Sequence, residues 1–246
     1  YQTLGKYKPD LSIAICAIGD ATCDSYPLQV SDFTSDPSQL EKSLKAIGCE
    51  GRGGGHITES YELFTYFMLN HCKATKAKSP HLLIFGDEMF YDFVNPKQVR
   101  HYVGDKLEDN LLSKDVFDKL MQKFNLYYLH KPYGNGDEKS IDIEVINAWA
   151  NVIGKQRVIE LPFEVKLLDG GKMPGYQRAV DIAMGLIAKS WGEYTDFSRS
   201  VDARHDDPGI RASINHSLRF VDADLSPKSK MYASSDSKKT KSLIDD

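Results

Sequence analysis

Short runs of consecutive apolar residues recur along the chain, separated by longer segments in which apolar positions repeat at helical spacing. The runs Leu11–Ile18 and His81–Phe85 each end at a Gly-Asp pair, and Asn125–His130 and Gln156–Leu161 are further short runs. Apolar runs without alternation predict strands that are buried on both faces. Tyr26–Phe33 alternates weakly and contains a proline, which predicts an edge strand.

The segments between these runs carry the signals of helices. Asp36 is placed to cap a helix that begins at Pro37, and Leu40, Leu44 and Ile47 then share one face of that helix. Helical spacing predicts further helices over Ser60–Cys72, Asn95–Tyr102, Asp115–Phe124, Asp142–Ile153, Tyr176–Trp191 and, more weakly, Ile210–Phe220.

The alternation of strands and helices predicts βαβ units and therefore an α/β fold, with a doubly wound, mainly parallel sheet and helices on both faces. We place this domain at residues 1–195. The apolar pattern weakens beyond it, so residues 196–246 are interpreted as a C-terminal extension that ends in a polar tail rich in Ser, Lys and Asp.

Composition and charge narrow the class of protein. The 246 residues carry a net charge of -4, which gives no basic field for nucleic-acid binding. No apolar run approaches the roughly eighteen residues that would predict a membrane span. The spacing of the four cysteines fits no CxxC metal motif, so we expect reduced thiols and a cytoplasmic protein.

A glycine-rich loop over residues 50–59 leads into the predicted helix at Ser60. It has three interpretations: an anion cradle, part of a metal site, or a tight turn before a helix. It lacks the Lys-Ser/Thr ending of a phosphate loop and the context of a dinucleotide fingerprint. Ligands bind beyond the carboxyl ends of the strands in doubly wound sheets. We therefore expect Asp20 and Asp87, which follow strands, to meet beside this loop.

Four short motifs occur in order over residues 11–161, and together they resemble the von Willebrand factor A family in its bacterial and kinase-associated branches. They are Ile18-Gly19-Asp20, Asp32-Phe33-Thr34, Gly53-Gly54-Gly55-His56-Ile57-Thr58-Glu59 and Phe85-Gly86-Asp87-Glu88. The resemblance implies a module that binds other proteins at the carboxyl edge of its sheet, often through a divalent metal ion.

The resemblance also implies which residues form the site. Asp87, Asp20 and His56 are the candidate metal ligands for magnesium or another divalent cation. His56 stands where related sequences have Thr or Asp, and an imidazole would suit zinc or nickel better than a hard cation. The candidate partner- or ligand-binding loop residues are Gly54, Gly55, Thr58, Glu59 and Glu88.

The chain departs from the family at its first strand. The family begins with an apolar strand that carries D-x-S-x-S, and no such strand precedes Leu11. We expect that strand to have been removed, to lie in an upstream segment, or to be supplied by another chain. The string Asp196-Phe197-Ser198-Arg199-Ser200 spells the motif but follows no apolar strand, so we attribute it to chance.

These observations favour a non-enzymatic protein-binding or structural module in a larger assembly, with protein partners, no nucleic acid and no catalytic residues. The alternative is a magnesium-dependent phosphatase of the haloacid-dehalogenase-like type, because Asp20 with Asp24 and Asp87 with Asp92 resemble its acidic magnesium motif. That chemistry needs a nucleophilic Asp in D-x-D-x-T/V after the first strand, and the sequence has no such string at a strand end.

Overall fold

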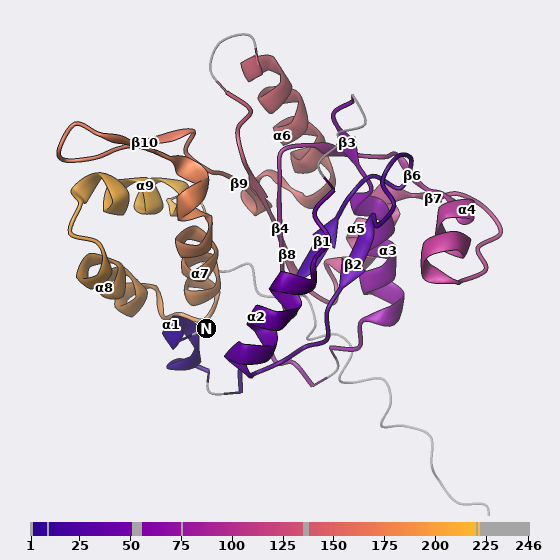
Figure 1. Ribbon diagram of the computed structural model, residues 1–246, viewed down its shortest axis with the longest axis horizontal. Coiled ribbons are helices and arrows are strands. Elements are labelled where there is room, and N and C mark those ends of the chain that lie inside the picture. Colours follow the sequence, from indigo (N-terminus) through magenta and orange to yellow (C-terminus); the bar gives the residue numbers. More distant parts are fainter. Residues whose placement is uncertain are drawn as a thin grey trace, which may run out of the picture.

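The computed structural model describes residues 2–8, 10–50, 56–74, 76–134, 138–219 and 221. These residues form a mixed α/β fold in which helices lie on both sides of a group of strands (Figure 1). Within the described ranges, no helix has both the length and the apolar character needed to cross a membrane.

Three parallel strands form the largest sheet, in the order β4 (His81–Gly86), β8 (Asn125–His130) and β9 (Val158–Glu160). All six residues of β8 are buried, as expected of a continuous apolar strand with a neighbour on each edge. The register sets Gly86 opposite His130, so the residues that follow β4 and β8 emerge side by side at the carboxyl edge.

Side chains of β8 alternate between two hydrophobic clusters on the two faces of this sheet. Leu126 and Tyr128 join the cluster of the first face, whereas Tyr127 and Leu129 join that of the second. The helices of the first face are α3 (Tyr61–His71), α5 (Ser113–Leu120) and α6 (Lys139–Ile153). Those of the second are α7 (Ala179–Ser190), α8 (Tyr194–Arg204) and α9 (Pro208–Leu218).

The predicted first strand differs from expectation in length and in pairing. Only Cys16–Ile18 forms a strand (β1), and it pairs antiparallel with β2 (Leu28–Val30). The turn after β1 reverses the chain: the Gly19 amide donates to the Pro27 carbonyl at 3.0 Å. The prediction of a mainly parallel sheet is therefore wrong for this pair, which no ladder among the described residues joins to β4.

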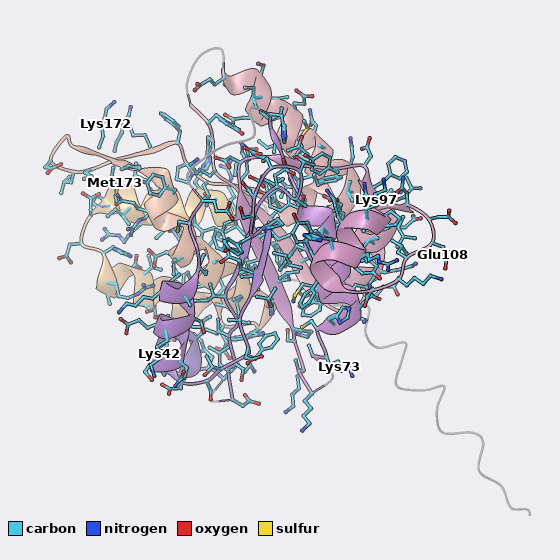
Figure 2. All side chains as sticks on the ribbon, turned by 45° about the vertical axis from the view of Figure 1, so that its right-hand side comes forward. Lys42, Lys73, Lys97, Glu108, Lys172 and Met173 are labelled. Carbon is cyan, nitrogen blue, oxygen red and sulfur yellow. The ribbon has the colours of Figure 1, made fainter. Side chains whose placement is uncertain are left out.

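Helix α2 (Pro37–Ala46) begins where the sequence predicts. The Asp36 carboxylate accepts a hydrogen bond from the Ser38 amide at 2.8 Å, which confirms it as the cap. In Figure 2, Lys42 of this helix points away from the body of the protein. No residue of α2 is buried, and Leu44 on its predicted apolar face is 57% exposed.

Short elements complete the fold. Strand β3 pairs parallel with β5, while β6 with β7 and β10 with β11 form antiparallel pairs. Figure 2 shows Lys172 and Met173 on the projecting hairpin of β10 and β11. The bounds are α1 (Gln2–Gly5), β3 (Thr58–Glu59), β5 (Met89–Phe90), β6 (Phe93–Val94), α4 (Pro96–Gln98), the π-helix η1 (Val99–Val103), β7 (Leu111–Leu112), the 3-10 helices η3 (Lys155–Arg157) and η4 (Gly175–Arg178), β10 (Glu164–Lys166) and β11 (Lys172–Pro174).

Helix α8, which spans the proposed domain boundary at residue 195, and helix α9, which follows it, both pack on α7. Phe197 and Val201 of α8, with Ile214 and Leu218 of α9, are buried in the second-face cluster. The string at residues 196–200 lies inside α8, where the Asp196 carboxylate accepts from the Tyr7 hydroxyl at 2.7 Å. The region assigned to the C-terminal extension therefore contributes buried side chains to the core of the domain.

The contrast between buried and exposed leucines gives a test of the fold. Leu126→Ala removes a fully buried side chain from β8, and we expect it to lower the free energy of unfolding by about 2 to 5 kcal/mol. Leu44→Ala removes the same atoms from the exposed face of α2, with an expected cost below about 0.5 kcal/mol. Urea denaturation measures both. Equal costs would contradict the packing described for α2.

Candidate functional site

Asp20 lies just beyond β1 and is almost completely enclosed, with 2% of its surface exposed. Its Oδ1 accepts from the Thr22 amide at 2.9 Å and from the Tyr91 hydroxyl at 3.0 Å, while Oδ2 accepts from the Thr22 hydroxyl. Burial acts to raise the pKa of Asp20, but these hydrogen bonds outweigh it and hold the pKa below its usual value. Asp20 is therefore a charged anchor for its own turn.

His56 is the one residue of the predicted metal set that contacts Asp20. Its Nε2 lies 3.1 Å from Asp20 Oδ2, and its ring makes an edge contact with the Tyr91 ring. About two-fifths of the His56 side chain is exposed, at 43%. The imidazole therefore closes the solvent side of the Asp20 carboxylate. Gly54 and Gly55, which precede it in the glycine loop, lie outside the described residues.

Asp87 follows β4 directly and is paired with a base. Lys131, which follows β8, places its Nζ on Asp87 Oδ2, and its amide also donates to the Gly86 carbonyl at 2.8 Å. The pair forms because the register of β4 and β8 brings the two residues together at the carboxyl edge. The sequence analysis did not select Lys131 as the partner of Asp87.

Thr58 and Glu59 form β3 and lie opposite Met89 and Phe90 of β5. The Glu59 Oε2 atom is buried and has no hydrogen-bond partner among the described residues. Burial raises the pKa of the Glu59 carboxyl to about 8, assisted by the nearby charges of Glu88, Asp24, Asp20 and Asp87. Asp20 and Asp87, although not on paired strands, therefore act on the same carboxyl group.

Glu88 lies next to Glu59 and is fixed through its backbone. Its carbonyl accepts from the Trp149 indole at 3.0 Å and from the Tyr128 hydroxyl at 3.2 Å, which ties it to the core. Among the described residues, its carboxylate accepts one hydrogen bond, a long one of 3.4 Å from the Tyr133 hydroxyl. Burial, followed by the charge of Asp87, raises the pKa of Glu88.

The sequence analysis missed Glu62, in the first turn of α3. Glu62 is fully buried, its Oε2 accepts from the Tyr91 amide at 3.2 Å, and its Oε1 has no partner in the described part of the chain. Burial raises the pKa of this carboxyl to about 8. An acid within the mainly apolar and aromatic stretch Tyr61–Met68 was the signal that could have identified it.

The carboxyl edge therefore gathers more acids than bases. The charges of Asp20, Asp24, Asp87 and Glu88 all act on Glu59. In the part of the chain that the structure describes, the bases that contact these acids are His56 and Lys131. Within the described ranges, no three His, Cys, Asp or Glu side chains are arranged to hold a metal ion. The predicted trio of Asp20, Asp87 and His56 is divided between two separate pairs.

The raised pKa of Glu59 gives a test with a defined sign. Between pH of about 4.5 and about 8 the folded protein holds a proton on Glu59 that the unfolded chain has released, so stability should fall as pH rises through this window. We expect Glu59→Gln to flatten the fall of the melting temperature, and Glu59→Gln with Glu62→Gln to flatten it further.

The control for this experiment is Glu144→Gln, which changes an exposed side chain on α6. Its melting temperature should follow the wild-type pH dependence. A wild-type profile that is flat from pH of about 5 to 8 would contradict the environment described for Glu59 and Glu62.

Comparisons of the whole chain were made with protein-family models, with curated proteins and with solved structures, and none of the three gives a match.

Proposed function

We propose that this chain is a von Willebrand factor A-like binding module, without catalytic activity of its own, that receives a positively charged group at its acidic carboxyl edge when it binds a protein partner. The observation that carries the proposal is the unpartnered, buried Glu59 oxygen beside Glu88. The four sequence motifs and the helix-covered parallel strands support the family resemblance and a doubly wound arrangement.

The negative charge around Glu59 is not compensated by a neighbouring base among the described residues. Each acid at this edge raises the cost of ionising Glu59, and a cation placed beside it would reverse that cost. The Asp20 carboxylate already accepts hydrogen bonds from Thr22 and Tyr91, and Asp87 is already paired with Lys131. These two acids would therefore attract the incoming group by their charge and not by direct contact. Glu59 and Glu88 are the side chains left to contact the incoming group.

The carboxylate oxygens at this edge are the kind of ligand that a divalent metal ion binds. Carboxylate oxygens are the ligands that magnesium, calcium and manganese prefer, and the unpartnered Glu59 Oε2 supplies one. Glu59 and Glu88 would hold the ion, which would neutralise the edge and offer a contact to a carboxylate of the partner. A lysine or arginine of the partner offers the same positive charge without an ion.

The haloacid-dehalogenase-like phosphatase remains an alternative that no observation at this edge favours. Asp20 and Asp24 serve the turn after β1, where the Asp20 amide donates to Asp24 Oδ2 at 2.7 Å. Hydrolysis of p-nitrophenyl phosphate by the protein with magnesium would support that alternative and contradict the proposed function.

Thermal stability with added ions tests the proposal. Magnesium, manganese, calcium and zinc chlorides are titrated at constant ionic strength. We expect at least one ion to raise the melting temperature progressively, since ligand at about 100 times its Kd adds about 2.7 kcal/mol to the folded state. Glu59→Gln with Glu88→Gln should abolish the response. The matched pair Glu41→Gln with Glu144→Gln, on exposed helix faces, should retain it.

A tetralysine peptide distinguishes the second source of charge. Stabilisation by the peptide alone, lost in Glu59→Gln with Glu88→Gln, would identify a basic side chain as the group received. If neither the ions nor the peptide stabilises the wild-type protein, or if the double variant responds equally, the proposed function is wrong.

A further inference from the structure

Four charged or titratable side chains meet between the start of α7 and the end of α8, on the second face of the sheet. They are Arg178, Asp181, Arg204 and His205. In Figure 1, α7, α8 and α9 lie together on one side of the strands, beside the hairpin of β10 and β11. The proposed site at the acidic edge uses none of these residues, so this basic cluster is separate from it.

Asp181 is the centre of the basic cluster, and its side chain is 9% exposed. Its Oδ1 accepts from Arg204 Nη1 at 2.8 Å and its Oδ2 from Arg178 Nη1 at 3.1 Å, while His205 Nε2 lies 3.2 Å from Oδ2. Two arginines therefore share one carboxylate. In the described part of the chain no other carboxylate pairs with either guanidinium, so one positive charge stays uncompensated.

The guanidinium of Arg178 uses one of its nitrogens and leaves the other two without a partner. Nη1 contacts Asp181 and His205, whereas no hydrogen bond to a described residue uses Nε or Nη2. The Nε–H and Nη2–H groups are parallel and form the fork that binds two oxygens of one carboxylate or phosphate. The Nε atom is buried, and a buried donor without a partner costs free energy. An acceptor is therefore expected beside this fork.

Arg204 supplies a further donor that solvent can reach. Its Nε donates to the Ser200 carbonyl at 3.2 Å and its Nη1 to Asp181, which holds the guanidinium in place and leaves Nη2 without a partner among the described residues. Its side chain is 34% exposed, compared with 14% for Arg178. Because both guanidinium groups are held on the same carboxylate, their free donors belong to neighbouring groups.

The backbone around the basic cluster is closely packed. A side chain at Gly175 would collide with the Pro162 carbonyl, so η4, which ends at Arg178, lies against the segment that follows β9. Arg211 donates to the His205 and Asp206 carbonyls at 2.8 and 3.0 Å, which fixes the turn between α8 and α9. The donors are therefore held in place before any ligand binds, which lowers the cost of binding.

From this geometry we infer that Arg178 and Arg204 form a binding site for one phosphate group, carried by inorganic phosphate or by a phosphate monoester. The Arg178 fork contacts two of its oxygens, and Arg204 Nη2 contacts a third. Asp181 and His205 are positioning residues, because they contact the arginines and not the phosphate.

The number of donors and the charge favour a phosphate group over a carboxylate. A carboxylate has two oxygens, whereas a phosphate monoester has three that can accept hydrogen bonds, one for each free donor of the site. At neutral pH a phosphate monoester also carries about 1.5 to 2 negative charges, which more than compensate the unpaired positive charge of the basic cluster.

NMR of the arginine Nε–H groups tests this inference directly. Inorganic phosphate is added at neutral pH, with sodium chloride keeping the ionic strength constant. We expect the Arg178 Nε–H resonance to shift until it saturates, because this hydrogen acquires an acceptor. Arg199, an exposed residue of α8 outside the basic cluster, is the internal control and should not shift. A second titration with O-phosphoserine distinguishes the free ion from a phosphate monoester as the ligand.

A conservative variant tests the fork itself. Arg178→Lys keeps the positive charge beside Asp181 but removes the fork, and we expect the response at Arg204 Nε–H to need at least about tenfold more phosphate. The matched control Arg199→Lys should bind phosphate as the wild type does. Amide spectra show whether each variant keeps the fold, and the wild-type titration stands alone if Arg178→Lys does not fold.

The variant Glu59→Gln with Glu88→Gln should also bind phosphate as the wild type does, since neither glutamate belongs to the basic cluster. The phosphate site and the proposed function can therefore fail separately.

Three results would overturn the inference. One is an Arg178 Nε–H resonance that phosphate does not change, which would mean that no phosphate oxygen reaches the fork. Another is an equal response to sodium acetate, which would make the site one for carboxylates. The third is equal phosphate binding by Arg178→Lys, which would reduce the effect to general attraction between charges.

Discussion

The fold depends on the complete enclosure of β8. Its backbone is paired on both edges, and its side chains enter the two hydrophobic clusters alternately, so that it fixes the helices on each face of the sheet. Trp149 extends this support to the carboxyl edge: its ring stacks on Tyr128 at 4.1 Å between centroids and its indole donates to the Glu88 carbonyl. The backbone of Glu88 at the acidic edge is thus held by side chains of the buried core.

The need of a strand for partners on both edges also explains why β1 and β4 are less buried than β8. A backbone amide or carbonyl inside a protein needs a partner, and a continuous apolar strand at a sheet edge leaves both its polar backbone and its side chains poorly covered. Helix α2 is also poorly covered by the rest of the protein, since none of its residues is buried.

Elements with strong local signals were predicted correctly from the sequence. The prediction failed where the structure depends on pairing between residues far apart in the chain. The strands β4 and β8, the Asp36 cap and the start of α3 follow from apolar runs and capping residues. The antiparallel pairing of β1 depends on the turn that Asp24 supports, and the continuous apolar run that contains β1 cannot reveal it. Helix α8 was missed because its apolar residues are few, although Phe197 is buried against α7.

The candidate site was predicted in part for the same reason. Strand ends indicated Asp20 and Asp87, but their partners Tyr91 and Lys131 come from other segments and have no local signature. The functional account depends on Glu59. The acids around Glu59 oppose its ionisation, and a cation bound beside it would relieve that repulsion. Carbon-detected NMR titration of the Glu59 carboxyl tests that account most directly. The account predicts a pKa near 8, and a value near 4.5 would contradict it.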